Sequence, residues 1–249
     1  MNKIIYPLLI SIVFFSCGDS EENFDTNIVI NLQHLCDNEL LSNNSLSHVS
    51  EAGENYNVQT LKYIITDLQL IAIGGDAVFA SGDERENILL KDFHYVDIND
   101  PSTLFIDKEI TGNGAYALSF TFGIDSINNI SNSLVNESFH PTMAWPDMMG
   151  GGYHYMKLEG AYMNDSTFYN THTGPTMGMD FSFTKTFDML INLDNNSILE
   201  YAIQMNVNNW YHNPHTINLA PAIMMDMPKQ MQLMSNGMTD VFTIQGLLD

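Results

Sequence analysis

Residues 181–207 read FSFTKTFDMLINLDNNSILEYAIQMNV and contain two apolar runs that flank a short polar turn. The runs are Phe181–Leu193 and Ile198–Val207, both rich in β-branched and aromatic residues, and the turn is Asp194-Asn195-Asn196. Apolar runs of this kind that end at clusters of Asn, Asp or Gly are typical of β-strands. This stretch therefore predicts strands on both sides of the turn.

The same pattern recurs along the chain, between turn clusters such as Gly74-Gly75-Asp76 and Gly112-Asn113-Gly114. The further strand segments are Asn27–Leu32, Leu61–Ile73, Ile88–Val96, Tyr116–Phe122, Tyr153–Tyr162, Phe168–His172 and Val241–Ile244. Strands spaced in this way favour an antiparallel β-sandwich over βαβ units. We therefore predict a mainly β fold, an antiparallel β-sandwich with one or two short helices.

Two segments have the spacing of helices. Ser126–Leu134 carries apolar residues every three or four positions, at Ile127, Ile130 and Leu134. Pro221–Asn236 carries a stripe of methionines, which predicts core packing. These methionines are Met224, Met227, Met231 and Met234. Pro228 is expected to kink or restart this helix, and Gly237 to end it.

The charge balance of the chain excludes several classes of partner. The 249 residues include 8 basic and 30 acidic ones, which gives a formal net charge of −22. Binding to nucleic acid or to anionic lipid through a basic patch needs the opposite charge. Because hydrophobic residues make up 45% of the chain, a folded core is expected despite this charge. We predict a single domain over residues 27–249.

The first seventeen residues, MNKIIYPLLISIVFFSC, are typical of an export signal. One early Lys3 precedes the apolar run Ile4–Phe15, which is too short to span a bilayer comfortably. The small residue before Cys17 resembles a lipoprotein cleavage box, which implies an acylated Cys17 and a membrane contact through this lipid only; the alternative is an ordinary signal peptide. Residues 18–26 are expected to form a short acidic tether.

The start of this tether, Gly18–Glu22, resembles the export tag of surface lipoproteins in Bacteroidetes-type bacteria. It implies an outer-membrane lipoprotein exposed at the cell surface, or otherwise one on the periplasmic face. If Cys17 carries lipid, Cys36 is the remaining thiol, so an intramolecular disulfide and a thiolate-based zinc site are excluded. Cys36 is expected to pack as a small hydrophobe.

Residues 139–179 hold the side chains best suited to chemistry. They include three of the eight His, seven of the sixteen Met and one of the two Trp. Imidazole and thioether are the ligands that remain for a soft metal when thiolates are absent, so this stretch favours copper, particularly Cu(I), over zinc. Clustered carboxylates in a loop with EF-hand spacing, as calcium would need, are absent from the sequence.

Each histidine in this stretch has a functional and a purely structural interpretation. His140 precedes a proline in a turn, and His172 ends a predicted strand, so each is either an exposed residue or a metal ligand. If Tyr153–Gly160 is a strand, His154 shares one face with Met156 and Leu158. It is then either a core histidine or a residue that binds or supports a metal.

The remaining candidates also keep two interpretations. His212 and His215 form an H-x-x-H beside Trp210, which suits a metal site or an exposed loop. The methionines that flank the candidate site in sequence are either gap-filling residues or a means to protect or relay Cu(I); they are Met143, Met148, Met149, Met177 and Met179. We interpret the scattered His34, His48 and His94 as structural or exposed.

Catalytic motifs are absent from the sequence. It contains no G-x-S-x-G, no H-E-x-x-H and no phosphate-binding glycine loop, and nothing selects a carboxylate pair for glycoside hydrolysis. We therefore do not expect an enzyme.

The segment HPTMAWPDMMGGGYHYMKLEG, residues 140–160, together with the later His172-Thr173-Gly174, resembles the MbnP-like copper-binding proteins. Members of that family include a periplasmic partner of methanobactin and a copper-repressible surface protein of methanotrophs. Their pattern is a His five residues before a Trp, then a Gly-Tyr segment that ends in Leu-Glu-Gly, and then H-x-G. The specific likeness covers about forty residues, and a weaker one, with Tyr63–Leu70 as an early strand, spans most of the mature chain.

The resemblance implies a β-rich fold and Cu(I) ligands His140 and His172. It also implies that Trp145 is oxidised to kynurenine by a diheme peroxidase and assists copper binding. The chain departs from the family where Pro146–Met149 replaces a second aromatic residue, and where the added His154 can replace or supplement a ligand, as can Met143. The leading hypothesis is a lipid-anchored protein that scavenges, stores or transfers Cu(I).

The alternative hypothesis is a surface β-sandwich lipoprotein that binds a glycan or another protein without a metal. Eleven Tyr and many Asn suit adaptable polar recognition. This alternative predicts exposed aromatic residues on one face and His140 far from His172.

Overall fold

The computed structural model describes residues 22–37, 39–41, 48–73, 85–163, 167–195, 197–220 and 223–247. The predicted signal peptide with Cys17, the first part of the predicted tether, the predicted turn at residues 74–76 and the predicted helix start at residue 221 lie outside them. Within the described ranges, no helix has the length and apolar character needed to cross a membrane.

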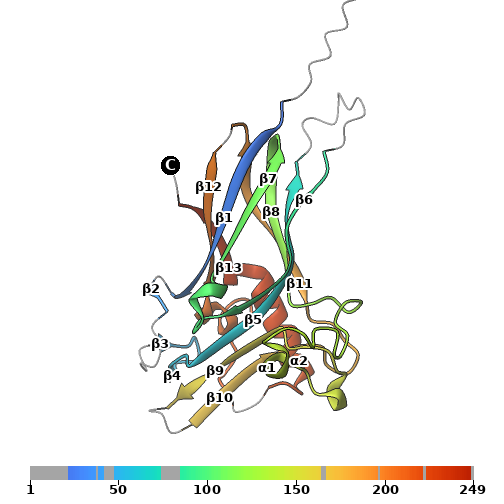
Figure 1. The fold of residues 1–249 in the computed structure, drawn as a ribbon. Coiled ribbons are helices and arrows are strands. Elements are labelled where there is room, and N and C mark those ends of the chain that lie inside the picture. Colours follow the sequence, from blue (N-terminus) through green and yellow to red (C-terminus); the bar gives the residue numbers. More distant parts are fainter. Residues whose placement is uncertain are drawn as a thin grey trace, which may run out of the picture.

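Two twisted sheets form the body of the protein (Figure 1). The first contains β1 (Phe24–Cys36), β2 (Glu39–Leu40), β7 (Phe105–Gly112), β12 (Ile198–Asn206) and β13 (Phe242–Gly246). The second contains β3 (His48–Val49), β4 (Asn55–Tyr56), β5 (Thr60–Ala72), β6 (Ile88–Asp97), β8 (Gly114–Phe122), β9 (Met156–Tyr162), β10 (Thr167–Thr173) and β11 (Phe183–Leu193). The predicted β-sandwich is confirmed, and each predicted strand segment corresponds to one of these strands.

Two features of the sheets differ from the simplest expectation. The turn after β11 leads into β12 of the other sheet, where β12 pairs with β1 in parallel from Asn27↔Ile198 to Leu35↔Asn206. All other pairs among the described strands are antiparallel. Strand β7 was missed because its charged residues face solvent and only Ile106, Ile110 and Gly112 are buried, which leaves a weak sequence signal.

The space between the sheets is filled with aromatic side chains. Phe122, Phe183, Trp210 and Phe242 lie in mutual contact, with ring centroids 5.1–6.4 Å apart. Cys36 is buried in the same core with its Sγ 3.5 Å from the hydroxyl of Tyr56, so its predicted packing is confirmed.

The helices differ from the predictions in position. Residues 126–134 form turns instead of a helix, and Ile127 and Ile130 are exposed. The Asp125 carboxylate accepts the backbone N–H groups of Ile127 and Asn128, which holds the chain in a turn. The four-residue helix α1 (His140–Met143) follows later in the same loop.

The second predicted helix is shorter than expected. Helix α2 (Met227–Asn236) begins after the N-cap Asp226, with Pro228 in its first turn, so Pro228 marks the start of the helix. Its buried residues are Gln230, Leu233 and Asn236, and the prediction of a buried methionine stripe is wrong for Met231, which is 50% exposed. After α2 come the π-turn Gly237–Val241 and strand β13.

One edge of β5 pairs with two strands in succession. Residues Ile65–Ala72 pair with β8, and residues Thr60–Tyr63 pair with β9, while β6 occupies the other edge. The change of partner occurs at Ile64, whose carbonyl accepts the N–H of Gly123 and whose N–H donates to the carbonyl of Tyr155. The loop between β8 and β9 therefore leaves and rejoins the sheet at one point.

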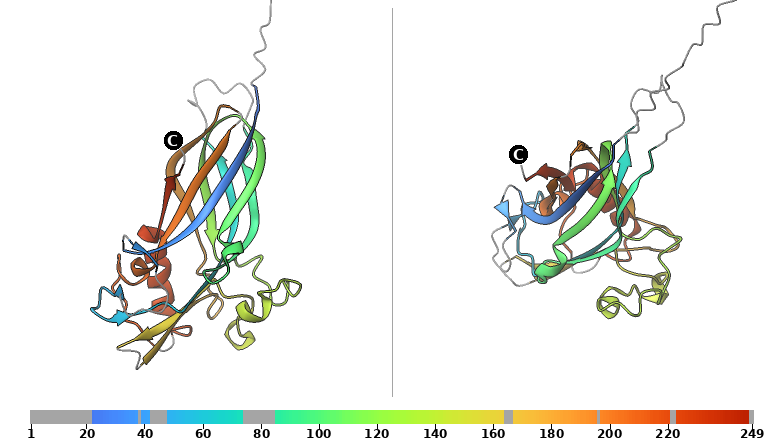
Figure 2. Two further views of the ribbon diagram at one scale, coloured as in Figure 1. Left: turned by 60° about the vertical axis from the view of Figure 1, so that its left-hand side comes forward. Right: turned by 45° about the horizontal axis from the view of Figure 1, so that its top comes forward.

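This loop, with β9, β10 and α2, lies at the lower end of the molecule in Figure 1. The start of β1 lies at the opposite end, and Figure 2 shows the same separation from two other directions. The end of the sheet that leads toward the N-terminus is thus remote from the loop that carries the candidate residues.

We expect Gly123→Ala to destabilise the fold near Ile64, where the edge of β5 changes its partner from β8 to β9. Gly123 has φ +89°, and an added Cβ would lie 2.5 Å from Cγ of Tyr155. Gly53 is the matched control, because it has φ +82° but no atom within 4 Å of an added Cβ. Denaturant unfolding of Gly53→Ala should show a loss of about 1 kcal/mol from backbone strain alone, and Gly123→Ala about 1–3 kcal/mol more from the clash. Equal losses would contradict this account.

Candidate metal centre

The outer face of the β9–β10 pair carries polar side chains. In the antiparallel register His172 lies opposite Lys157, with Glu159 two residues further along β9. Thr171 and Thr173, on either side of His172, are buried toward the sandwich core, whereas His172 is half-buried on the outer face. The candidate centre is built on this outer face.

The segment before β9 folds back on the residues after α1. Ala144 and Tyr153 form an isolated antiparallel bridge, the N–H of Trp145 donates to the carbonyl of Gly152 at 2.8 Å, and the N–H of His154 donates to that of Met143 at 2.7 Å. The three glycines at 150–152 all have positive φ, a backbone conformation that glycine adopts readily and that lets the chain turn here. This pairing places Trp145 and His154 side by side.

Three rings meet at this place. The ring centroids of Trp145 and His154 are 4.7 Å apart with an interplanar angle of 75°, and those of His154 and His172 are 5.0 Å apart at 80°. Trp145 is 2% exposed and His154 is 5% exposed. Two imidazoles and an indole therefore share one buried site.

Hydrogen bonds determine which nitrogen of each imidazole carries a lone pair. His154 Nδ1 lies 3.0 Å from the carbonyl oxygen of Met143, which can only accept, so Nδ1 carries the proton and Nε2 the lone pair. His172 Nε2 lies 2.6 Å from Oε1 of Glu159, so in the neutral ring Nδ1 carries the lone pair. Both lone-pair nitrogens, and also Nε1 of Trp145, are buried and have no hydrogen-bond partner among the described residues.

Electrostatics keep His154 in a form that can bind a metal. Burial lowers the pKa of His154 to about 3, so this imidazole is neutral at physiological pH. The hydrogen bond from His172 lowers the pKa of Glu159 and keeps its carboxylate charged. Lys157 lies 3.9 Å from this carboxylate and donates to the carbonyl of Thr142, which ties α1 to the outer face of β9.

Two neighbours hold the second imidazole and the indole in place. The side chain of Gln230, on α2, donates to the carbonyl oxygen of His172 at 2.7 Å. An added Cβ at Gly174 would lie 2.7 Å from Cε3 of Trp145, so the indole packs directly on this backbone. The glycine of His172-Thr173-Gly174 is therefore required by the close approach of Trp145.

Comparison with known proteins assigns the chain to a family. The MbnP family model matches residues 25–226. The chain belongs to the MbnP family. Among solved structures it is similar to MbnP from Methylosinus trichosporium, with a TM-score of 0.56 and 11% sequence identity over 90% of this chain and 99% of that chain. At this identity the structural likeness shows the fold alone, and no curated protein matches the sequence significantly.

The resemblance to MbnP proteins implied His140 as a ligand, and the structure gives this residue another contact. His140 Nδ1 is hydrogen-bonded to the Tyr153 hydroxyl at 3.0 Å, and that hydroxyl accepts the N–H of Leu134 at 2.8 Å. The ring of Tyr153 contacts His140, whereas the ring of its neighbour His154 contacts Trp145 and His172. Among the described contacts His172 meets His154, and the pairing of His140 with His172 stays a prediction.

The condition set for the orientation of His154, a strand that begins at Tyr153, is not met. The sequence pattern placed it on the face of Met156 and Leu158, but these two residues are in the core, while the ring of His154 lies against His172. The reason is that regular β9 begins only at Met156, so strand alternation does not extend back to His154. The glycines before Tyr153 are the sequence signal that could have warned of this. Met143 is fully buried, and its carbonyl oxygen, described above, orients His154.

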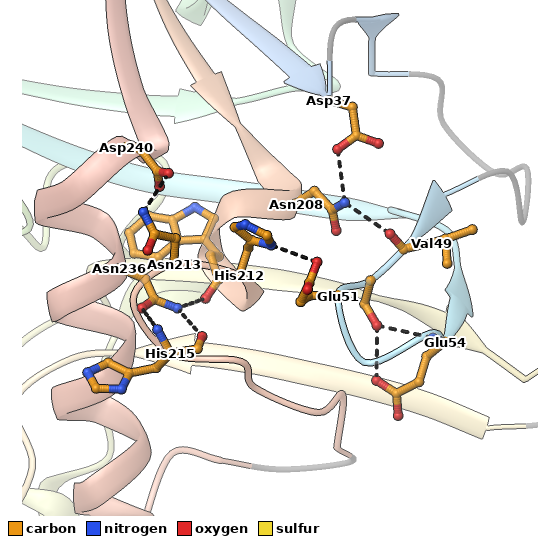
Figure 3. Close-up of polar contacts among 12 residues, drawn as sticks. Asp37, Val49, Glu51, Glu54, Asn208, His212, Asn213, His215, Asn236 and Asp240 are labelled. Carbon is orange, nitrogen blue, oxygen red and sulfur yellow. Dashed lines mark hydrogen bonds and ion pairs between the residues drawn. The ribbon is translucent and has the colours of Figure 1, made fainter.

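The other histidines do not add to this centre. His212 Nδ1 lies 2.8 Å from Glu51 Oε2, and Figure 3 shows the ring of His215 directed away from His212. His34 bonds the Tyr63 hydroxyl, and His94 bonds a backbone carbonyl, which confirms their structural interpretation. Among the described residues, no group of three or more His, Cys, Asp or Glu side chains is arranged to hold a metal.

We expect the metal-free protein to lose stability as the pH falls below 6.5. Burial lowers the pKa of His34 from 6.5 to about 4 and that of His154 from 6.5 to about 3, so in these windows the unfolded chain binds protons that the folded chain does not. Each histidine then removes about 1.4 kcal/mol of unfolding free energy per pH unit. Denaturant unfolding from pH 7 to 4 should show a shallower slope for His34→Gln and for His154→Gln. An unchanged slope in either variant would contradict its buried neutral state.

Proposed function

We propose that this MbnP family member binds one Cu(I) ion between Nε2 of His154 and Nδ1 of His172, with Trp145 beside it. The observation that carries this proposal is the pair of buried lone-pair nitrogens on touching imidazoles. A buried polar atom without a partner costs about 1–3 kcal/mol, so a folded protein normally satisfies it. An ion between the two rings would satisfy both nitrogens at once.

The donor set favours Cu(I) among the common metals. Zinc is almost always bound by four ligands in structural sites and by three protein ligands in catalytic sites. Calcium and magnesium need several oxygen ligands, whereas the nearest carboxylate, Glu159, is already committed to His172. Cu(I) accepts two or three ligands, and imidazole is a suitable one. The carboxylate behind His172 would raise the basicity of the bound imidazole.

The proposed role is to hold and hand over copper outside the cytoplasm, by scavenging, storage or transfer. It is a binding role and not a catalytic one. The formal net charge of −22 would concentrate cations near the surface. We also propose that Cys17 carries lipid and anchors the protein to the outer membrane, on the cell surface or the periplasmic face. The start of β1 lies at the end of the molecule opposite the candidate centre (Figure 1), so the site would face away from this anchor.

We further propose that Trp145 is converted to kynurenine and that a diheme peroxidase is the partner for this step. The indole Nε1 of Trp145 is buried without a partner, 4.7 Å from His154 in ring-centroid distance. Opening the indole would place an aromatic amine and a ketone oxygen beside the imidazoles. Both groups can bond to neighbours or to the ion in ways that the closed indole cannot.

The alternative function, binding of a glycan or protein without a metal, has lost part of its basis. It predicted exposed aromatic residues on one face, but every tyrosine in the described ranges is buried or half-buried, and the exposed aromatic residues there, Phe105 and Phe168, lie on different sheets. The function would regain support if the purified protein failed to bind copper.

Single histidine variants test the ligand assignment. Under anaerobic conditions, competition with a chromophoric Cu(I) chelator should show one tight site in the mature chain. His154→Ala and His172→Ala should each weaken Cu(I) binding by more than about 100-fold, beyond what loss of a supporting hydrogen bond causes. His140→Ala is the matched control, because its ring contacts Tyr153, and it should bind nearly as well as the wild type.

The same measurement separates the two ligand assignments. If His140→Ala binds as weakly as His172→Ala while His154→Ala binds normally, the ligands are those implied by the family resemblance, and the geometric assignment is wrong.

Mass spectrometry of the protein from its native host tests the modification. We expect the peptide with Trp145 to have lost one carbon and gained one oxygen, the change from tryptophan to kynurenine. Trp210 is the internal control, because it is equally buried and its Nε1 also lacks a partner, but its ring neighbours are phenylalanines. An unmodified Trp145, or equal modification of both residues, would reject a site-specific reaction.

A further inference from the structure

The turn after the candidate centre presents methionine where packing cannot explain it. Thr176 and Met179 exchange two backbone hydrogen bonds of 3.0 Å, so Met177 and Gly178 are the central residues of a tight turn. Both have positive φ, +53° and +80°, and such turns favour Asn, Asp or Gly at the first position. Met177 is nevertheless there, 71% exposed, and Met179 is 47% exposed.

Two further exposed thioethers lie on segments that adjoin the same place. The Thr176 hydroxyl donates to the carbonyl oxygen of Met224, which brings the next residue, Met225, close to the turn; Met225 is 60% exposed. Met148 follows Trp145 by three residues, in the 3-10 turn Asp147–Met149, and is 89% exposed. We call Met148, Met177, Met179 and Met225 the methionine rim.

Two segments of the methionine rim adjoin Trp145 of the candidate centre, one in sequence and one through Gly174. The turn at 176–179 begins two residues after Gly174, whose backbone supports the indole of Trp145. By contrast, Met143 and Met156, which also flank the imidazoles in sequence, are fully buried and fill the core. The methionines around the centre are thus of two kinds, buried and exposed, and the filling of core gaps explains only the buried ones.

The chemistry of an exposed thioether suggests a ligand. Methionine is usually placed in irregular core gaps, and exposing it to water forgoes the burial that would stabilise the fold. Thioether sulfur is a soft ligand that selects Cu(I) over calcium, magnesium or zinc. It carries no charge and no proton near neutral pH, so a site made from it works without a pH change.

We propose that the methionine rim is a second, shallow Cu(I) site that captures the ion at the surface and passes it to the histidine pair. The transfer step rests on the proposed function, but binding of a soft monovalent ion by the rim does not. Transfer is an exchange of ligands, in which the copper stays Cu(I) and thioether bonds are replaced by bonds to imidazole. Because the two-histidine site is buried, the ion needs an accessible first contact, and the rim supplies it.

Methionine methyl NMR with silver tests binding by the rim directly. Ag(I) is a soft, redox-inert probe that can be added to the mature chain carrying His154→Ala and His172→Ala. The methyl signals of the four rim residues should shift together on titration. Met163 and Met238 are the controls, 56% and 50% exposed but on other parts of the fold. No shift of the rim signals, or equal shifts of the controls, would overturn the proposed site.

Loading kinetics test the transfer. The variant with all four rim residues changed to Leu keeps side-chain volume, and Met163→Leu with Met238→Leu is its matched control. In stopped-flow loading from a Cu(I)–glutathione complex, the rim variant should load about tenfold more slowly, an effect of about 1.4 kcal/mol on the barrier. Its equilibrium affinity for Cu(I) and its thermal unfolding should equal those of the control variant.

The outcomes separate the two proposals. An unchanged loading rate in the rim variant would reject the transfer step while leaving the histidine site intact. Cu(I) binding that is unchanged in His154→Ala and His172→Ala but lost in the rim variant, together with silver shifts confined to the rim, would reject the histidine site and keep the rim as a thioether site.

Discussion

Strand β5 offers one edge to two partners, and the exchange at Ile64 is the constraint on which the candidate centre depends. Ile64 accepts a hydrogen bond from Gly123 and donates one to Tyr155, so β8 leaves and β9 enters at a single residue. The intervening loop must therefore start and finish at the same point of the sheet. This closure folds the loop back on itself and brings α1 against the start of β9.

The returning loop orients its own histidine through one backbone atom. The carbonyl oxygen of Met143 accepts both the N–H and the ring Nδ1–H of His154, and this leaves Nε2 buried without a partner among the described residues. Glu159, on the strand paired with that of His172, bonds Nε2 of His172, so that Nδ1 is the nitrogen with the lone pair in the neutral ring. The two halves of the centre thus come from different elements, and each imidazole is held by an acceptor behind it. Such support is what keeps a metal site in a ready geometry.

The cost of this arrangement is a set of local features that do not help folding. Buried nitrogens without partners, left-handed glycines at 150–152 and exposed methionines at a tight turn each oppose stability on their own. Departures from local rules tend to gather at functional sites, and here they gather around Trp145. The candidate centre lies at the end of the molecule opposite the start of β1.

The sequence by itself determined the strand segments, the β-sandwich class and the stretch in which the centre lies, because these follow from local composition and from the residue types that copper prefers. It also identified Cys36 as a packing residue. Tertiary structure alone decided that β1 and β12 run parallel and that residues 126–134 do not form a helix. It alone brought His154 against His172, and His140 against Tyr153. The physical reason is that the hydrogen-bond acceptor behind each imidazole decides which ring nitrogen keeps its lone pair. These acceptors, the Met143 carbonyl and the Glu159 carboxylate, lie 11 and 13 residues away in the chain and reach the rings only when the backbone folds back.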